Sequence, residues 1–542
     1  MKKYLLLGFI ILAATVLRFY QLGVNPPSLT WDEVAFGYNA YSLGVDGRDE
    51  FGQYLPIVYL ESFGDFKPPV YAYLDVVPVK IFGLTPFAVR FPSALFGVLT
   101  VLLTYFLTKR IFYSSEHKEL YALTSSFVLA LSPWHIMLSR AGFEANVATF
   151  FVVAGIFTFL AGMQEKKWWI VVSAVSFVLA MNTFNSSRVV VPLVILALGA
   201  VFFKKLWKQR KQTFTAILVG LVLLAPLIPF LFSPQAGLRF KEVNIFSDST
   251  LVTTSNQEIA NDGNAIWSKA IHNRRVQYSL AFLQHYFDHF NPGYLFIRGD
   301  VNTKFSIQDV GELYLWDLPF FIIGGLFLFR RKEGYWWIIP VWLLLGIIPA
   351  ATARETPHAL RTEVILPTMQ IIVGYGIAVA LLFVKEKIKR HAVKHLLLGI
   401  GGCLLIANIF YFQYEYYKHY PRLYSQDWQY GYQQAIDFVS KQPGYEKVYD
   451  SGSYGRPYIY YLFFTKTDPG EFRKTLTVQR DAFGFVHVKG FGKYVFPEDF
   501  GKLPKSEKAL YVDSVNNVPK HAKIIKTIGL VDGTPSLAVY TY

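Results

Sequence analysis

The chain has 542 residues, of which 53% are hydrophobic and 17% are charged, and its formal net charge is +15. Soluble domains usually carry about 25% charged residues, so this composition excludes a chain of ordinary soluble domains. The positive charge does not indicate nucleic-acid binding, because the basic residues form short clusters between apolar runs, where membrane topology determinants lie. The single cysteine, Cys403, excludes a disulfide framework and a cysteine-based metal site.

Apolar runs dominate the chain from its first residues. The first run follows Met1-Lys2-Lys3, continues to about Leu22 and has no small-residue cleavage site, which predicts an uncleaved first span rather than a signal peptide. A helix that crosses a bilayer needs about 17–25 apolar residues. Eleven runs meet this length: 4–22, 87–108, 119–138, 145–163, 167–184, 188–204, 213–232, 313–330, 335–352, 361–384 and 395–415.

A further run at 68–83 is shorter and contains Pro68, Pro69, Asp75 and Pro78. The basic clusters decide its place, because lysine and arginine favour the cytoplasmic side of a membrane. With eleven spans and a cytoplasmic N-terminus all clusters lie inside, whereas counting 68–83 as a crossing breaks this agreement after the first cluster. We therefore expect 68–83 to be a membrane-surface or re-entrant helix. The clusters are Lys2-Lys3, Lys109-Arg110 with Lys118, Lys166-Lys167, Lys204 to Lys211, Arg330-Arg331-Lys332 and Lys385 to Lys394.

This sidedness predicts a multi-pass protein of the cell (plasma or inner) membrane whose polar segments gather on the extracytoplasmic face. After about Pro421 the chain loses its spanning hydrophobicity, and short β-rich runs alternate with helical ones. We expect a mainly α membrane module over 1–420 and a small soluble extracytoplasmic α/β domain over 421–542. The β-rich runs are 446–450, 508–513 and 535–541, and the helical runs are 428–441 and 456–465. The external polar segments are the first loop 23–86, the turns near 139–144 and 185–187, the long loop 233–312 and the turn 353–360.

The first external loop contains Trp31-Asp32-Glu33-Val34-Ala35-Phe36-Gly37 just beyond the first span. Two adjacent carboxylates cannot point the same way, so one can face a substrate while the other orients a neighbour or caps a helix. A helix N-terminus, where acids are favoured by the helix dipole, is the simpler alternative, and position alone favours it.

Cationic residues lie on the same expected face. Lys67 stands directly before Pro68-Pro69 at the headgroup level, and Arg90 lies near the outer end of the second span. Each is explained by snorkelling to the interface or by contact with a phosphate. Further polar clusters share this face while the inner loops are mainly lysine-rich connectors, which indicates a site or a charged vestibule outside. These clusters are Ser139-Arg140-Ala141-Gly142-Phe143-Glu144, the run from Asn182 to Arg188, and Arg354-Glu355-Thr356-Pro357-His358-Ala359-Leu360-Arg361.

The ordered motifs resemble a known family. Trp-Asp-Glu-Val-x-Phe-Gly after the first span looks like the Asp-Glu motif of protein O-mannosyltransferases. Lys-Pro-Pro, Arg-Phe-Pro-Ser-Ala-Leu-Phe-Gly and Leu-Ser-Pro-Trp-His-x-x-x-Ser-Arg resemble bacterial members of glycosyltransferase family 39, which includes the aminoarabinose transferase that modifies lipid A. The resemblance covers roughly residues 5–200 well and implies the GT-C fold, here with about 11 transmembrane helices. The C-terminal domain is not the sugar-binding MIR module of eukaryotic mannosyltransferases, so it does not imply a protein acceptor.

The resemblance implies an inverting glycosyltransferase on the extracytoplasmic face. It would move mannose or another monosaccharide from a polyprenyl phosphate to a hydroxyl, amine or phosphate group of an acceptor lipid, glycan or protein. A monophosphate donor makes a metal dispensable, so no cofactor is required, although a divalent metal stays open. By motif, Asp32 is the expected general base, Glu33 positions the acceptor or tunes Asp32, and the expected donor-phosphate ligands are Lys67 first, then Arg90, Arg140 and Arg361. Further substrate-binding candidates are Trp31, Tyr38, Glu144 and His358, with Trp31 and Tyr38 equally explained as interfacial anchors and His358 as a structural residue.

Other functions stay open. An oligosaccharide ligase of the same superfamily uses a diphosphate-linked donor, so the number of phosphates on the donor separates it from the transferase. A lipid-linked-sugar transporter or flippase is expected to carry ionisable residues near the bilayer midplane and repeat symmetry, neither of which is clear here. A non-catalytic receptor is disfavoured by the intact Asp-Glu and Lys-Pro-Pro motifs. The loop 233–312, with Arg239, Arg274 and Arg275, is a candidate cover for the site.

Overall fold

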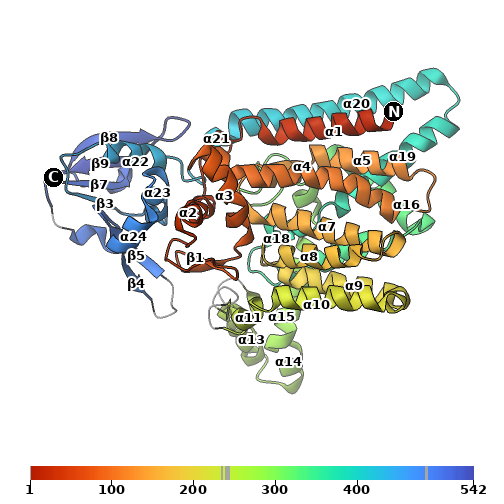
Figure 1. The fold of residues 1–542 in the computed structure, drawn as a ribbon, viewed down its shortest axis with the longest axis horizontal. Helices are drawn as coiled ribbons and strands as arrows, with labels where there is room; N and C mark the ends of the chain where they lie inside the picture. Colours follow the sequence, from red (N-terminus) through yellow and green to blue (C-terminus); the bar gives the residue numbers. More distant parts are fainter. Residues whose placement is uncertain (1, 234–235, 238–243, 482–485, 504) are drawn as a thin grey trace. The chain divides into compact units, whose positions relative to one another are not determined.

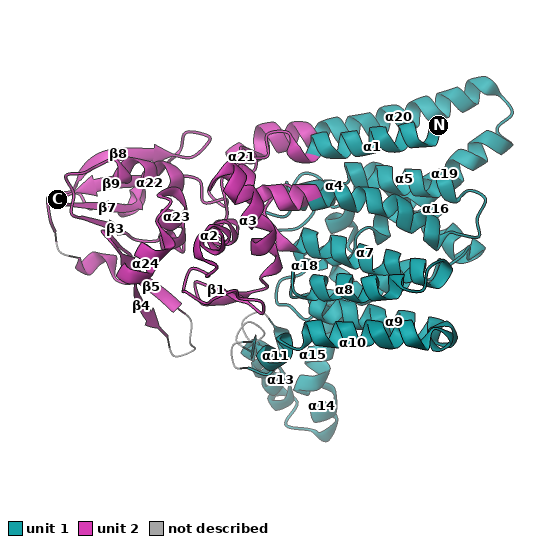
Figure 2. Cartoon of the chain, viewed as in Figure 1, with its two compact units in different colours: residues 1–17, 96–138, 145–412 teal, residues 18–95, 139–144, 413–542 magenta. Residues whose placement is uncertain are grey.

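The computed structural model describes residues 2–233, 236–237, 244–481, 486–503 and 505–542. It is mainly helical, with a mixed β-sheet near the C-terminus (Figure 1). The chain divides into two compact units (Figure 2). The helical unit comprises Met1–Leu17, Phe96–Leu138 and Ala145–Phe412, and the sheet unit comprises Arg18–Leu95, Ser139–Glu144 and Gln413–Tyr542.

Helices of very different length make up most of the helical unit. They are α1 Lys2–Phe19, α4 Pro86–Ile111, α5 Lys118–Leu131, α6 Pro133–Ser139, α7 Glu144–Gln164, α8 Trp169–Met181, α9 Ser187–Lys208, α10 Arg210–Leu224, α11 Leu227–Leu231, α13 Ser249–Asn261, α14 Ile266–Ile271, α15 Arg274–Asp288, α16 Leu318–Arg331, α17 Ile338–Ala351, α18 Ala359–Thr362, α19 Thr368–Lys387 and α20 His391–Tyr414. Of these helices, α1, α4, α6, α7 and α20 continue into the sheet unit. Short 3-10 or π turns lie at Ile245–Ser247, Gly293–Arg298, Leu315–Asp317, Glu363–Ile365 and Glu415–His419.

The chain is a multi-pass membrane protein. Among the described residues five helices are long and apolar enough to cross a bilayer, or six if α5 and α6, bent by 56°, form one broken span. Each of the eleven apolar runs contains a helix, but α8 and α17 are shorter than a full span, so the count of eleven crossings and the sidedness stay predictions. The short run 68–83 forms a helix of 13 residues, and its place on the membrane surface also stays a prediction. The five helices are α4, α7, α9, α19 and the stretch His391–Leu423.

Close packing in the helical unit depends on small residues. α16 lies against α19, and α19 lies against α5. A Cβ atom built on Gly324 would lie 1.9 Å from the Ile372 carbonyl oxygen, and one on Gly376 would lie 2.0 Å from the Phe320 carbonyl oxygen. No larger side chain fits at this crossing, which is the small-residue packing typical of membrane helices.

The sheet unit is built around a seven-stranded sheet with the order β4-β5-β6-β3-β7-β9-β8. β3 pairs in parallel with β6 and β7, and the other neighbours pair antiparallel. The expected β-rich runs coincide with β3, β7 and β9, and the expected helical runs contain α22 and α23, which confirms the C-terminal α/β domain. The strands are β1 Leu60–Ser62 and β2 Asp65–Lys67, which form a separate hairpin, then β3 Lys447–Asp450, β4 Thr477–Arg480, β5 Val486–Phe491, β6 Tyr494–Val495, β7 Ala509–Ser514, β8 Lys523–Gly529 and β9 Pro535–Thr541. The helices are α2 Trp31–Asp46, α3 Val70–Phe82, α21 Tyr420–Leu423, α22 Tyr432–Ser440, α23 Pro457–Phe464 and α24 Pro469–Thr475.

Residues from the first external loop of the prediction share one hydrophobic core with the C-terminal domain. α2 packs against both α3 and α23, and Val34 and Val89 belong to the same buried cluster as Ile459 and Phe463. A Cβ atom on Gly37 of α2 would lie 2.5 Å from Val89 Cγ2 and 2.7 Å from Phe463 Cε2, so the contact requires glycine. The division of the chain at residue 420 stays a prediction, because the core joins segments from both sides of it.

Candidate active site

The Asp-Glu motif forms the first turn of α2. Thr30 is the N-cap: its hydroxyl accepts a hydrogen bond from the Glu33 amide at 3.3 Å, and the Glu33 carboxylate accepts one from the Thr30 amide at 2.8 Å. This reciprocal pair is a capping box, which the order Thr-x-x-Glu favours, and it sets both acids at the positive end of the helix dipole. The helix-start alternative is therefore confirmed for Glu33, and the cap fixes the turn that carries Asp32.

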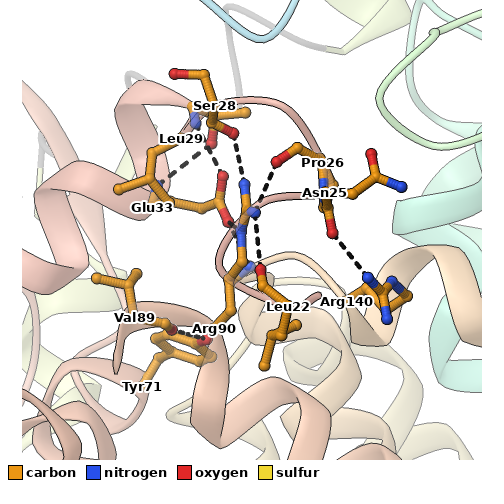
Figure 3. A network of polar contacts seen from close by, with 12 residues as sticks. Leu22, Asn25, Pro26, Ser28, Leu29, Glu33, Tyr71, Val89, Arg90 and Arg140 are labelled. Atoms are coloured by element: carbon orange, nitrogen blue, oxygen red, sulfur yellow. Dashed lines mark hydrogen bonds and ion pairs between the residues drawn. The ribbon is translucent and has the colours of Figure 1, made fainter. Parts of the chain in front are cut away.

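Glu33 also forms a buried ion pair with Arg90 of α4 (Figure 3). Arg90 Nε donates to Glu33 Oε1 at 2.8 Å, and the Gly142 amide donates to the same oxygen at 2.8 Å. The other guanidinium N–H groups donate to the backbone carbonyls of Leu22 at 3.1 Å, Pro26 at 2.9 Å and Ser28. Neither side chain of the pair is exposed, and buried charges are tolerated only where they are paired and hydrogen-bonded. Glu33 thus holds structure here, and its contact with an acceptor stays a prediction.

Arg140 is held in a similar way. It is buried, and its guanidinium donates to the Asn25 carbonyl at 2.9 Å and to the Tyr416 hydroxyl at 3.1 Å. The same group lies 5.3 Å from the ring centroids of Tyr416 and Tyr417. Both Arg90 and Arg140 therefore anchor the backbone before α2. Contact of either arginine with a donor phosphate stays a prediction.

Asp32 lies in different surroundings from its neighbour. Its side chain is 39% exposed, whereas that of Glu33 is 0% exposed. The ammonium group of Lys67, whose side chain is 8% exposed, donates a hydrogen bond to Asp32 Oδ1. The two adjacent carboxylates thus lie in different surroundings: Glu33 is buried in an ion pair, and Asp32 is partly exposed and bound to a cation.

Lys67 is the last residue of the β1–β2 hairpin. Leu60 pairs with Lys67, and the two-residue turn consists of Phe63 and Gly64, whose φ angles of 43° and 80° are both positive. Two positive φ angles match the twist of a tight hairpin, and glycine adopts them without strain. Pro68 follows directly and cannot continue the hydrogen-bond ladder, so the strand ends with the lysine beside α2.

Three carboxylates act on Lys67. Asp32 is in direct contact, Asp65 Oδ2 lies 3.8 Å from the ammonium nitrogen, and Glu144 adds a further attraction. Burial lowers the pKa of Lys67, but the attraction of the three acids outweighs burial and holds the pKa above its usual value. Lys67 is therefore a cation near neutral pH.

Arg456 lies beside the same hairpin turn, although it belongs to the C-terminal domain. Its guanidinium carbon is 4.0 Å from the ring centroid of Phe63 and 5.6 Å from that of Trp31. Lys67 Nζ lies 5.1 Å from the Phe63 centroid, so one aromatic ring contacts both cations. Sequence reasoning missed Arg456, because no local pattern connects it with Asp32. The one available signal was its position directly before a proline that starts a helix.

The aromatic candidates differ in exposure. Tyr38 is buried in the core, and its hydroxyl donates to the Thr467 carbonyl at 3.0 Å. Trp31 is partly exposed and lies under Arg456. Tyr38 therefore serves the core, and substrate binding by either residue stays a prediction.

His358 and Arg361 belong to the helical unit, at the start of α18. His358 Nδ1 accepts from the Arg361 amide at 3.4 Å, and the His358 amide donates to His289 Nε2 at 3.2 Å. Burial and the nearby Arg361 charge hold the pKa of His358 well below its usual value, so the ring is neutral. The approach of these residues to Asp32 stays a prediction, because Asp32 belongs to the sheet unit.

Two further expectations concern metals and the long loop. No group of three or more His, Cys, Asp or Glu side chains suited to a metal ion occurs in the part of the chain that the structure describes. The loop 233–312 contains α13, α14 and α15, with Arg274 and Arg275 in the first turn of α15. Arg239 lies outside the described residues, and the role of the loop as a cover stays a prediction.

Known proteins resemble this chain both in sequence and in fold. Residues 66–230 match the family model described as "Dolichyl-phosphate-mannose-protein mannosyltransferase". An uncharacterised protein of Aquifex aeolicus (strain VF5) is 30% identical over 215 residues, which is 39% of this chain, and the chain spans only 39% of the length of that relative.

Two solved structures match over nearly the whole chain. ArnT from Cupriavidus metallidurans in the apo state has a TM-score of 0.54 and 14% identity, and the match covers 98% of this chain and 97% of that chain. The same protein bound to undecaprenyl phosphate has a TM-score of 0.54 and 13% identity, with the same coverage of 98% and 97%. At this identity the likeness shows a common fold.

Proposed function

Because residues 66–230 match the dolichyl-phosphate-mannose-protein mannosyltransferase family that the motifs predict, and because the chain has an ArnT-like fold, we propose that it is an inverting GT-C glycosyltransferase using a polyprenyl-phosphate sugar donor. The observation that carries the proposal is the pairing of Asp32, an accessible carboxylate, with Lys67, a buried ammonium group. A carboxylate suits the removal of a proton, and a fixed cation suits a departing phosphate.

Asp32 acts as the general base. Its carboxylate takes the proton of the acceptor hydroxyl while the hydroxyl oxygen forms a bond to the anomeric carbon. The bond from that carbon to the phosphate oxygen breaks, and its electron pair leaves with the polyprenyl phosphate. Attack from the side opposite the leaving group inverts the anomeric configuration. A positioned base contributes about 10²–10⁴-fold in rate, and the partial exposure of Asp32 gives an acceptor access to it.

Lys67 stabilises the leaving phosphate. Negative charge grows on the phosphate oxygens as the bond breaks, and one preorganised donor at such a charge contributes about 2.7–4 kcal/mol. Since Lys67 donates to Asp32, an arriving phosphate competes with the carboxylate for the ammonium group. When Lys67 turns to the phosphate, Asp32 loses the hydrogen bond from Lys67 and becomes a stronger base. Donor binding thereby prepares the base for the acceptor.

The ion pair between Glu33 and Arg90 holds the turn that carries Asp32 in place. It fixes the first turn of α2 on α4 and on the Gly142 amide, so that Asp32 projects from a rigid turn. Catalytic groups must be held within a fraction of an ångström of their working geometry, which a rigid secondary element provides better than a loop.

The family description names mannose, and a relative in fold was solved with undecaprenyl phosphate. An undecaprenyl-phosphate-linked monosaccharide, mannose first, is therefore the donor to assay. The acceptor is a hydroxyl, amine or phosphate group of a lipid, a glycan or a protein on the extracytoplasmic face. Mass spectrometry of lipids, glycans and proteins from cells with the wild type or Asp32→Asn identifies it.

Sugar transfer by the purified full-length protein tests the proposal. Asp32→Asn is expected to lower turnover by at least about 10²-fold, because the amide cannot accept the proton. Asp65→Asn is the matched control, because Asp65 Oδ2 lies 3.8 Å from the Lys67 ammonium nitrogen but Asp65 is not the proposed base. This variant is expected to retain most of the turnover. Turnover of Asp32→Asn equal to that of an active wild type excludes Asp32 as the base. Preference for a diphosphate-linked donor would instead favour an oligosaccharide ligase.

A further inference from the structure

The charge around Lys67 is unfavourable for a phosphate. Asp32 contacts the ammonium group and Asp65 Oδ2 lies 3.8 Å from it, while Glu144, whose pKa burial raises to about 7, adds a weaker attraction. A phosphate approaching Lys67 therefore competes with two carboxylates for one ammonium group, and those carboxylates repel it. A site that binds polyprenyl phosphate here needs a second cation.

The nearby arginines do not supply it. Arg90 is neutralised by Glu33, and its remaining N–H groups are held by backbone carbonyls. Arg140 is held by carbonyl and hydroxyl oxygens beneath the tyrosine rings. Both side chains are fully buried, and in this arrangement protein oxygens occupy their N–H groups.

Arg456 has the required properties. It is partly exposed, it contacts the ring of Phe63 that also contacts Lys67, and it lies over Trp31 next to Asp32. Its hydrogen bond to the Phe63 carbonyl is long, at 3.4 Å. No acidic side chain among the described residues forms an ion pair with it, so its charge is not neutralised by a neighbour there.

The position of Arg456 is fixed from two directions. It is the N-cap of α23 with a φ of 51°, a left-handed conformation that a non-glycine residue adopts only when its surroundings hold it there. From the same helix, the Tyr458 hydroxyl accepts from the Phe63 amide at 2.9 Å and donates to Glu50 at 2.9 Å. A Cβ atom on Gly455 would lie 3.4 Å from Trp31 Cζ3. The start of α23 is therefore locked against the turn that carries Lys67.

We propose that Arg456 is the second fixed cation of the Asp32–Lys67 site and that it binds an anionic oxygen group of a substrate. Two sources have this chemistry, the phosphate of the donor and an acidic group on the acceptor. A guanidinium stacked on aromatic rings keeps its N–H groups at its edge, where they donate in pairs to a phosphate or a carboxylate. The inference rests on the proposed function and extends it, because the C-terminal domain then contributes a substrate-positioning residue.

The test uses the full-length protein in lipid nanodiscs, as wild type and as Arg456→Gln, Arg456→Lys and Arg473→Gln. Arg473 is the matched control, because it also joins the C-terminal domain to α2, at the opposite end of that helix. It donates to Asp46, to the Ser42 hydroxyl at 3.2 Å and to the Asp49 carbonyl at 3.1 Å. Thermal unfolding identifies any variant that fails to fold.

The first measurement is the affinity for undecaprenyl phosphate. If Arg456 binds the donor phosphate, Arg456→Gln weakens this affinity by about tenfold or more, which is the loss expected for a charge-assisted hydrogen bond. Arg456→Lys is expected to lose less affinity, because lysine keeps the positive charge but not the paired N–H donors of the guanidinium. Arg473→Gln is expected to bind undecaprenyl phosphate as tightly as the wild type. If the group belongs to the acceptor, this affinity is unchanged, and the KM for the acceptor rises about tenfold in Arg456→Gln while kcat is preserved.

Unchanged affinity for undecaprenyl phosphate together with an unchanged acceptor KM in folded Arg456→Gln overturns the inference. An equal loss in Arg473→Gln also overturns it, since loosening of the whole domain then explains the effect. Failure of the proposed function looks different: the wild type transfers no sugar from a polyprenyl-phosphate donor. In that case the binding measurement still decides whether Arg456 holds a phosphate.

Discussion

Arg90 Nε lies 2.8 Å from Glu33 Oε1, and neither side chain is exposed. The pair joins the first turn of α2 to α4, and the Gly142 amide completes the contact from a third segment. Two residues that the motifs associate with substrate therefore form the frame of the site. The position of Asp32, next to Glu33, depends on this buried pair. Substitutions in the pair therefore test its effect on stability separately from the chemistry proposed for Asp32.

Arg90→Gln is expected to lower the free energy of unfolding by about 3–5 kcal/mol, because it leaves the Glu33 carboxylate buried without its partner. Arg480→Gln breaks the pair between Arg480 and Glu61, which are 2.9 Å apart, at a site where Arg480 is 55% exposed. This control is expected to cost at most about 1 kcal/mol. Denaturant unfolding of the detergent-solubilised variants compares the two. Similar costs for both arginines would contradict a framing role for Arg90.

Lys67→Met is expected to lower kcat by about 10²–10³-fold, because the departing phosphate loses its fixed cation. Lys67→Arg keeps a cation and is expected to retain more turnover, although the guanidinium does not reproduce the position of the ammonium group. Steady-state kinetics with an undecaprenyl-phosphate-linked sugar measures both variants. A rise in KM at unchanged kcat would assign Lys67 to ground-state binding instead.

Glu50→Gln is expected to stabilise the protein in a pH-dependent way. Glu50 is buried, accepts from the Tyr458 hydroxyl at 2.9 Å, and burial raises its pKa to about 8 from an ordinary value of 4.5. The fold favours the protonated acid, so its contribution to stability is complete below pH 4.5 and declines as the pH rises towards 8.

The measurement for Glu50 is the unfolding temperature of wild type and Glu50→Gln at two pH values. The glutamine variant is expected to unfold close to the wild type near pH 5 and at a higher temperature than the wild type at pH 8 and above. A difference that stays the same at both pH values would show that Glu50 does not titrate in this range.

Gly37→Ala is expected to cost about 1–3 kcal/mol of stability and to reduce transfer, because the added methyl overlaps Val89 and Phe463 between α2 and α23. Gly444→Ala is the matched control, since a Cβ atom there meets nothing within 4 Å. Unfolding and transfer assays on both variants give the comparison. Full stability of Gly37→Ala would mean that the two helices separate more easily than their packing indicates.

Elements with a local signal in the sequence were predictable, whereas strands that depend on distant neighbours were not. Long apolar runs and short runs of β-forming residues are local signals, so the membrane helices and β3, β7 and β9 were predictable. β4 was not, because all four of its residues are exposed, and in β8 five of seven residues are exposed, which removes the alternation that marks a strand. Their pairing is decided by neighbours distant in the chain.

The site shows the same limit. The Asp-Glu and Lys-Pro-Pro motifs singled out Asp32 and Lys67 only together with the resemblance to a known family, because position alone favoured a plain helix start. Sidedness indicates the face on which a residue lies but not its depth, so the complete burial of Arg90 and Arg140 was not predictable. Arg456 reaches the site through the packing of α23 on α2, which no spacing in the sequence encodes.

The shared core of α2 and the C-terminal domain decides which piece of this protein could be exchanged with a relative. A chimaera that replaces residues 421–542 alone would set a foreign α23 against the native Gly37 and Val34, and the mismatch would fall on the helix that carries Asp32. The exchangeable unit is discontinuous in sequence, so residues 18–95, 139–144 and 413–542 have to be replaced together. A graft of these three segments would bring Asp32, Lys67 and Arg456 with the core that positions them.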